Sequence, residues 1–196
     1  IRCWGLDSLA QLGDGAGPAT NPASPIVRRT PVAVRNLPVA TAVSAGSSTT
    51  CALVGAGSVT CWGANGVGQL GAGPYVPAVA TPPTTVGPGL LPTTKAIAVG
   101  AFHACAVALA GSFWCWGDGT SGQTGIGQTV QSWVPVQLIR MGDLPMGTPN
   151  RVSLGRDHSC ATIGATLYCW GGNSDGQLGI GSTAFQTIAK PVPGVA

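Results

Sequence analysis

Six of the seven cysteines in this chain of 196 residues could react as pairs, because the members of each pair are only nine or ten positions apart. The pairs are Cys51 with Cys61, Cys105 with Cys115, and Cys160 with Cys169. A metal site needs ligands at shorter spacing, such as Cys-x-x-Cys, and a redox dithiol normally occurs at one place rather than in every repeat. We therefore predict structural disulfides and no metal ion or cofactor, with reduced, buried cysteines as the alternative.

The residues between the cysteines predict the elements that must position them. In "CATIGATLYC" a two-residue hairpin loop falls on Gly164 and Ala165, and the longer pairs fit three-residue loops with Gly57 or Gly111 in third position. Such loops place two cysteines opposite each other on antiparallel strands, about 4.5 to 5.5 Å apart at Cα, which a disulfide tolerates. Disulfides form in oxidising compartments, so we expect an exported protein, either extracellular or at the cell surface.

One repeat organises the whole chain. Cys-Trp-Gly begins at Cys3, Cys61, Cys115 and Cys169, and Gly-Gln-Leu-Gly or a close variant follows it each time. Pro-rich loops separate short apolar segments that lack a helical period, so we expect strands and turns throughout. The units are approximately 1–40, 41–94, 95–149 and 150–196. We expect the four shared tryptophans to pack between units.

Cys3 is the cysteine left unpaired in this chain. The alignment of the repeats places its partner about ten residues upstream, before Ile1. The closing segment "KPVPGVA" elsewhere leads into the next cysteine-bearing hairpin. We therefore expect either a longer repeat protein or a unit that a neighbouring chain completes.

The repeat resembles the regulator of chromosome condensation repeat family. The resemblance rests on Gly-x-x-His at Gly100–His103 and Gly155–His158, on Trp-Gly followed by Asn65 or Asn173, and on the Gly-Gln motifs. It implies an all-β fold, a β-propeller of four-stranded antiparallel blades, present as an arc of three complete repeats plus partial blades at the ends. The added cysteine pair resembles the exported bacterial branch of the family. An open arc exposes strand edges, so we expect a protein partner or further copies of the chain to cover them.

The residues that could support catalysis do not form a recognisable set. His103 and His158 occupy the same repeat position, whereas a catalytic histidine is normally unique and stands beside a nucleophile or carboxylate. The six aspartates are scattered over loops, and "GGNSDGQLG" lacks the closing acid of a calcium loop. We expect a non-enzymatic protein, and a hydrolase or lyase using one of these histidines remains the less favoured alternative.

Charge and hydropathy point to protein binding as the function. The net charge is only +3 and basic residues do not cluster beyond Arg28 and Arg29, which argues against nucleic acid as a partner. We find no apolar run of about 18 residues, which argues against membrane insertion. We expect a protein-binding and assembly module, or alternatively a subunit of a self-assembling extracellular polymer. The variable loops 14–40, 72–94 and 126–150 would carry recognition, and the candidate binding surface is formed by Tyr75, Trp133 and Phe185.

Overall fold

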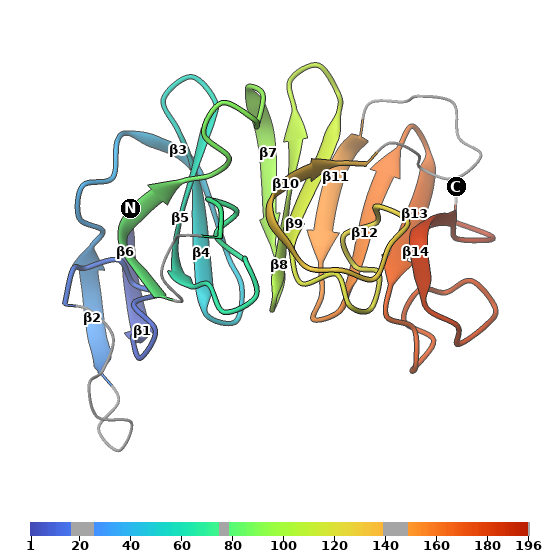
Figure 1. The fold of residues 1–196 in the computed structure, drawn as a ribbon, viewed down its shortest axis with the longest axis horizontal. Helices are drawn as coiled ribbons and strands as arrows, with labels where there is room; N and C mark the ends of the chain where they lie inside the picture. Colours follow the sequence, from blue (N-terminus) through green and yellow to red (C-terminus); the bar gives the residue numbers. More distant parts are fainter. Residues whose placement is uncertain (17–25, 75–78, 139–148, 196) are drawn as a thin grey trace.

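The chain folds into β-sheets that stand side by side in an arc (Figure 1). A computed structural model describes residues 1–16, 26–74, 79–138 and 149–195. The described residues form fourteen strands and no helix. In chain order the strands are β1 (Arg2–Leu6), β2 (Val27–Ala33), β3 (Ala40–Ala45), β4 (Thr49–Val54), β5 (Ser58–Ala64), β6 (Val79–Thr85), β7 (Thr94–Val99), β8 (His103–Ala108), β9 (Phe113–Gly117), β10 (Ser132–Gln137), β11 (Pro149–Leu154), β12 (His158–Ile163), β13 (Thr166–Gly171) and β14 (Gln186–Pro191).

Three of the sheets are complete four-stranded antiparallel meanders. We call them blade I (β3–β6), blade II (β7–β10) and blade III (β11–β14). The N-terminal sheet contains β1 and β2 only, and it lies at the opposite end of the arc from β14 (Figure 1). The predicted propeller architecture is therefore confirmed, with the partial blade at the N-terminal end of the described chain. The sequence division into four units remains a prediction.

The hairpins that carry the cysteines have the loops that the sequence predicts. Ile163 pairs with Thr166 across the two-residue loop, and Gly164 there has φ of +58°. Val54 pairs with Ser58 across a three-residue loop that ends at Gly57, which has φ of +106°. Glycine is favoured at both loop positions because L side chains rarely adopt positive φ.

The Trp-Gly step creates a kink in the third strand of the blades. Register shifts interrupt the pairing between Cys61 and Gly63, and the same shift recurs in β1 and β13. The glycine of this step has positive φ in all four sheets, and a Cβ on Gly117 would stand 2.6 Å from the carbonyl oxygen of Phe102. The bulge therefore requires glycine.

The hydrophobic core lies between adjacent blades. One cluster joins blades I and II around Trp116, and a second joins blades II and III around Trp170. The ring of Phe113 meets that of Trp170 edge to face, with centroids 5.7 Å apart. A smaller cluster packs Trp62 against residues that include Cys3 and Val34 of the N-terminal sheet.

Candidate functional site: the blade interfaces and the open edge of β1

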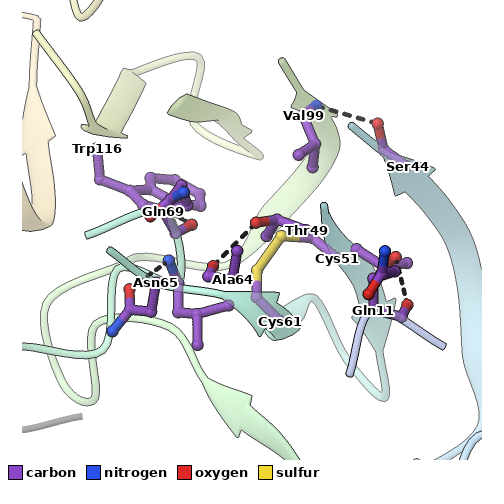
Figure 2. Close-up of a disulfide and its surroundings, with 12 residues drawn as sticks. Gln11, Ser44, Thr49, Cys51, Cys61, Ala64, Asn65, Gln69, Val99 and Trp116 are labelled. Carbon is purple, nitrogen blue, oxygen red and sulfur yellow. Dashed lines mark hydrogen bonds between the residues drawn. A yellow bond between two sulfur atoms is a disulfide. The ribbon is translucent and has the colours of Figure 1, made fainter. Parts of the chain in front are cut away.

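A disulfide joins the two middle strands of every complete blade. The bridges link Cys51 to Cys61, Cys105 to Cys115, and Cys160 to Cys169. The members of each pair stand directly opposite in register, and their Cα atoms are 4.1 Å apart in all three bridges. Figure 2 shows the first bridge. The predicted disulfide bonds are thus present. The first two lie in the cores between blades, whereas the third belongs to neither core and its Cys160 is only partly buried.

The shared tryptophan of each complete blade forms a hydrogen bond to the preceding sheet. The indole Nε1–H of Trp116 donates to the main-chain oxygen of Gln69 at 2.8 Å (Figure 2). The equivalent bonds run from Trp62 to Gln11 at 3.0 Å and from Trp170 to Gln123 at 2.9 Å. The Gly-Gln motif therefore supplies both an acceptor for the next indole and a turn against which that indole rests.

The main-chain oxygens of two of these glutamines accept a second hydrogen bond. The hydroxyl of Ser159 donates to the Gln123 oxygen at 2.8 Å, as that of Thr50 donates to Gln11 at 3.0 Å. Because the Ser159 proton is used in this way, its oxygen accepts from Nε2–H of His103, at 2.8 Å. A chain of hydrogen bonds therefore crosses from blade II to blade III and back.

His103 takes part in this chain as a buried neutral group. Its side chain has no exposure to solvent, and no described residue forms a hydrogen bond with Nδ1. Burial lowers the pKa of His103 to about 4, with a further decrease from His158 that Asp118 opposes. The ring is hydrogen-bonded to a hydroxyl and to no carboxylate, so its contacts belong to the interface between the blades. In the described part of the chain, no group of three or more His, Cys, Asp or Glu side chains could hold a metal ion.

The three residues expected on the binding surface have different positions. Phe185 precedes β14 and is 55% exposed. Trp133 lies in β10 and is half-buried, and its carbonyl oxygen accepts from the amide of Gly73 at 2.9 Å. The backbone of Trp133 thus belongs to the interface of blades I and II, which the sequence alone did not indicate. Tyr75 lies outside the described residues.

The N-terminal sheet has an open edge along β1. β1 carries the same Cys-Trp-Gly as β5, β9 and β13, but it pairs with β2 alone. Trp4 is 64% exposed, whereas its three equivalents are fully buried and rest against the Gly-Gln turn of the preceding sheet. Cys3 is the free cysteine, and burial raises the pKa of its thiol, an effect that the N-terminal amine opposes.

A groove follows this open edge. It has a volume of about 420 Å³, and its walls come from β1 and the turn after it, from β3 and the turn after it, and from the start of β4. The lining includes Cys3, Trp4, Leu6, Val43, Ala45 and Thr50. We call this feature the β1 groove. It is largely apolar and has a strand edge along one side, which suits an extended polypeptide better than a small charged ligand.

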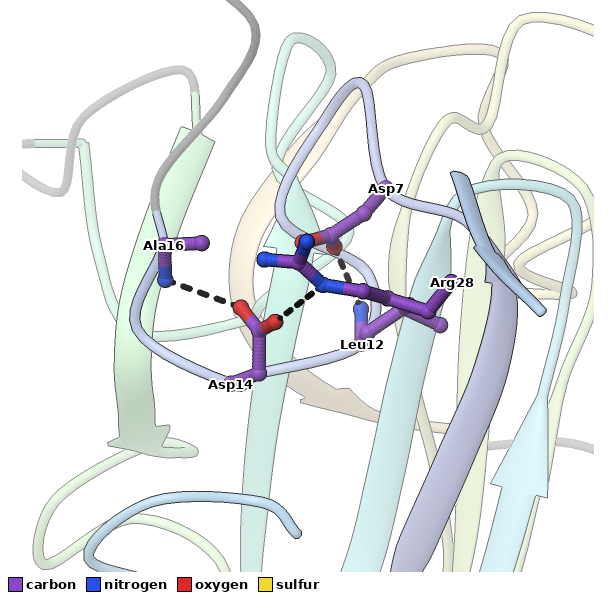
Figure 3. Close-up of polar contacts among 5 residues, drawn as sticks. All are labelled: Asp7, Leu12, Asp14, Ala16 and Arg28. Atoms are coloured by element: carbon purple, nitrogen blue, oxygen red, sulfur yellow. Dashed lines mark hydrogen bonds and ion pairs between the residues drawn. The ribbon is translucent and has the colours of Figure 1, made fainter. Parts of the chain in front are cut away.

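A buried carboxylate directly after β1 was not singled out by the sequence analysis, which placed it among the aspartates scattered over loops. Asp7 is fully buried, and its Oδ1 accepts from the Leu12 amide at 2.9 Å (Figure 3). Asn173 occupies the equivalent place in blade III, where Oδ1 accepts from Leu178 and Nδ2 donates to two carbonyl oxygens. In Asp7 the atom that replaces this nitrogen, Oδ2, has no hydrogen-bond partner within the part of the chain that the structure describes. Aligning Asp7 with Asn65 and Asn173 would have revealed it.

Two charged side chains accompany Asp7 (Figure 3). Arg28 forms an ion pair with Asp14, with Nε 2.8 Å from Oδ2. Burial raises the pKa of Asp7, and the Asp14 carboxylate raises it further, against the opposing effects of the Leu12 amide and Arg28. The pKa of Asp14 is lowered, because hydrogen bonds from Ala16 and Arg28 outweigh the effect of burial.

Comparison with known proteins agrees with this geometry. Two family models, both described as the regulator of chromosome condensation (RCC1) repeat, match residues 40–69 and 95–123, and residues 110–162 and 165–194. The chain belongs to the regulator of chromosome condensation repeat family. Together the matches include all six bridging cysteines.

Curated members of this family align over nearly the whole chain. The mitochondrial RCC1 domain-containing protein RUG3 of Arabidopsis thaliana is 31% identical over 98% of this chain and 42% of its own length. The ultraviolet-B receptor UVR8 of the same plant is 29% identical over the same shares. The chain thus spans less than half the length of these two RCC1-repeat relatives.

Several solved structures share the fold. Yeast RCC1 (Prp20), solved bound to Kap60, superposes with a TM-score of 0.79 at 21% identity, over 97% of this chain and 44% of that one. Human WBSCR16 gives 0.78 at 20% identity, over 95% and 46%. A further structure of Prp20p from Saccharomyces cerevisiae is described together with its binding to Gsp1p and histones. At these identities the likeness establishes the propeller fold.

Proposed function

We propose that this chain is a non-enzymatic protein-binding and assembly module of an exported protein, and that it binds through the β1 groove. The observation that carries this proposal is the unpaired edge of β1, where Trp4 is 64% exposed beside an apolar groove of about 420 Å³. A free strand edge offers main-chain donors and acceptors to an incoming strand, and the adjoining groove offers pockets for its side chains.

Several observations support the location and the class of partner. Three disulfides within 196 residues favour an oxidising compartment, and we infer an extracellular or cell-surface protein of the disulfide-bearing bacterial branch. The yeast relative Prp20 is described with protein partners, namely Kap60, Gsp1p and histones. No helix of the described chain is long and apolar enough to cross a membrane. Phe185 and Trp133 form the second binding surface that this proposal includes.

A peptide selection tests the proposal. Peptides displayed on phage are selected on the folded chain, and the enriched peptides are then measured on Trp4→Asp and Val43→Asp, which place charge in the groove. Binding should fall at least about tenfold in both variants, because a buried unpaired charge opposes docking. The control is Leu109→Asp, since Leu109 is 67% exposed at a hairpin turn outside the groove lining. Peptides that bind all variants equally would contradict the proposal, and loss of binding only in Phe185→Ala would move the site to the loops.

A subunit of a self-assembling polymer is the second candidate. The observation that favours it is at the other end of the arc, where the Gly-Gln motif of blade III meets no indole. A Cβ on Gly71 or Gly125 would lie 2.6 Å from the ring of Trp116 or Trp170, whereas one on Gly179 would meet only Val192. The exposed Trp4 of a second copy could fill that place. Light scattering that shows growth with concentration in the wild type and not in Trp4→Asp would favour this candidate.

A further inference from the structure

Apolar side chains gather on one rim of the arc. Val39 and Leu109 are the two most exposed large hydrophobic side chains of the described chain, at 85% and 67%, and Leu90 is 53% exposed. Val39 directly precedes β3, and Leu109 directly follows β8. In Figure 1 the turn 55–57, the loop 87–93 and the turn 109–111 lie along the upper edge of the arc. We call Val39 together with these three segments the turn rim.

Main-chain hydrogen bonds join the turn rim into one continuous line. The amide of Gly55 donates to the Val39 oxygen at 3.1 Å. Bonds of 2.9 and 2.7 Å then connect this turn to residues 93–94 and those residues to Leu109. A Cβ on Gly55 would meet no atom within 4 Å, so the turn projects into open space. The exposed side chains therefore stand on a fixed ridge of projecting turns.

The charged side chains are divided between the two ends of the strands. Lys95 is exposed at the second position of β7, and Arg151 is exposed opposite Thr162 near the end of β12. Both basic residues therefore lie close to the hairpin turns. Four of the five described aspartates lie at the other end of the strands, namely Asp7, Asp118, Asp157 and Asp175.

The turn rim carries no acidic residue among the residues that the structure describes. The fifth described aspartate, Asp14, is neutralised by its ion pair with Arg28. A surface that is apolar at its tips, basic behind them and free of carboxylates is complementary to anionic lipid headgroups, because the tips leave water and the cations are attracted.

We propose that the turn rim rests on an anionic lipid surface, with Val39, Leu90 and Leu109 in the headgroup region and Lys95 and Arg151 facing the headgroup phosphates. This inference goes beyond the proposed function and uses a different surface, since none of these residues lines the β1 groove. The contact is peripheral and needs no membrane-crossing segment. It turns the rim that carries the aspartates away from the lipid.

The shape of the turn rim favours a lipid surface over an acidic polypeptide. Its three most exposed side chains stand on separate turns, and a fluid surface accommodates separate tips without a matching hollow. The rim has one hollow of about 280 Å³, between the turn 55–57 and the loop 87–93. All residues that line this hollow are uncharged, so it offers no cation to an acidic side chain.

Sedimentation with lipid vesicles tests this inference on the folded chain. Vesicles of phosphatidylglycerol and phosphatidylcholine in equal parts should bind at least about tenfold more tightly than pure phosphatidylcholine at low ionic strength, and salt should weaken the difference. Val39→Ser and Leu109→Ser should each weaken binding at least about fivefold, because less apolar surface leaves water. Lys95→Ala should weaken it about fivefold.

The matched control is Phe185→Ser, which removes an exposed apolar side chain directly before β14, at the opposite end of the strands. It should leave vesicle binding unchanged. Hydrogen–deuterium exchange with anionic vesicles should become slower in the turns 55–57 and 109–111 and stay unchanged in the turn 100–102. Urea denaturation of each variant, with an unchanged midpoint, confirms that a loss of binding is not a loss of fold.

The other outcomes would overturn the inference. These are equal binding to both kinds of vesicle, binding to neither, and equal losses in Phe185→Ser and Leu109→Ser. Binding to polyglutamate instead of anionic vesicles would identify an acidic polypeptide as the occupant. Loss of vesicle binding only in Trp4→Asp would place the lipid contact in the β1 groove. Peptides selected for the β1 groove should bind Val39→Ser and Leu109→Ser normally, so failure of this inference is distinguishable from failure of the proposed function.

Discussion

Replacing Asp7 with asparagine should stabilise the protein. Asp7 is fully buried and its Oδ2 has no hydrogen-bond partner among the described residues, whereas Asn173 at the equivalent position uses Nδ2 to donate to the carbonyl oxygens of Ser182 and Ala184, at 2.7 and 3.0 Å. Leaving a buried polar group unsatisfied costs about 1–3 kcal/mol. We therefore expect Asp7→Asn to raise the free energy of unfolding at pH 7 by about 1–2 kcal/mol. The expected gain is below the upper limit of that cost because the substitution also removes the attraction between Asp7 and Arg28.

The gain should depend on pH in a defined direction. The folded-state pKa of Asp7 is raised above the ordinary value of 3.8, so the folded state holds this proton more tightly than the unfolded state. The stability contributed by the protonated group is present below 3.8 and is lost as pH rises through the folded pKa. The difference between wild type and Asp7→Asn should consequently be largest at neutral pH and should vanish below about pH 3.8.

Urea denaturation followed by tryptophan fluorescence measures this effect at pH 7 and at pH 3.5. The matched control is Asp175→Asn, an exposed aspartate of blade III, for which a change within about 0.5 kcal/mol is expected. A neutral or destabilising Asp7→Asn at pH 7 would refute the reasoning, because it would mean that the charge of Asp7 is needed in the fold.

Three further predictions concern the interfaces between blades. Trp116→Phe should lower the free energy of unfolding, measured by urea denaturation, by about 1–3 kcal/mol, because the buried main-chain oxygen of Gln69 loses its hydrogen-bond donor. The same substitution at the exposed Trp4 should be nearly neutral. Replacing Cys105 and Cys115 by serine should lower stability by roughly 2–3 kcal/mol, as expected for a short disulfide loop, without changing the β-sheet circular dichroism. Because the pKa of His103 in the folded state is lowered to about 4, the free energy of unfolding should fall as pH drops from 6.5 to about 4. In His103→Asn the free energy of unfolding should depend less steeply on pH over this range, and an unchanged dependence would contradict this prediction.

The hairpins and disulfides were predictable because their determinants are local. A cysteine pair and the glycine of the loop between them fix the register within about ten residues, and the structure has the same loops at Gly57 and Gly164. The position of three of the four shared tryptophans between blades followed from repetition alone. The expectation was wrong for Trp4, which is 64% exposed.

The polar contacts between blades could not be predicted in the same way. The acceptor of each tryptophan is a main-chain oxygen of another sheet, and side-chain identity does not reveal which carbonyl lies there. Asp7 was counted only among six aspartates scattered over loops, because its burial depends on packing that its own sequence neighbourhood does not reveal. Trp133 was selected as an aromatic residue of a variable loop, whereas it lies in β10 and is half-buried. The hydrogen bond between its carbonyl oxygen and the Gly73 amide of the neighbouring blade could not be read from the sequence.

Hydrogen–deuterium exchange on the folded chain, with and without a peptide enriched by the phage selection, tests protein binding at the β1 groove most directly. Strand addition predicts slower exchange of main-chain amides in Arg2–Leu6, where the free edge gains hydrogen bonds, and in the groove-lining residues of β3 and the turn after it. The hairpin turn around Leu109 should be unaffected. Unchanged exchange in Arg2–Leu6 at saturating peptide, or protection confined to the loops that carry Phe185, would contradict the account.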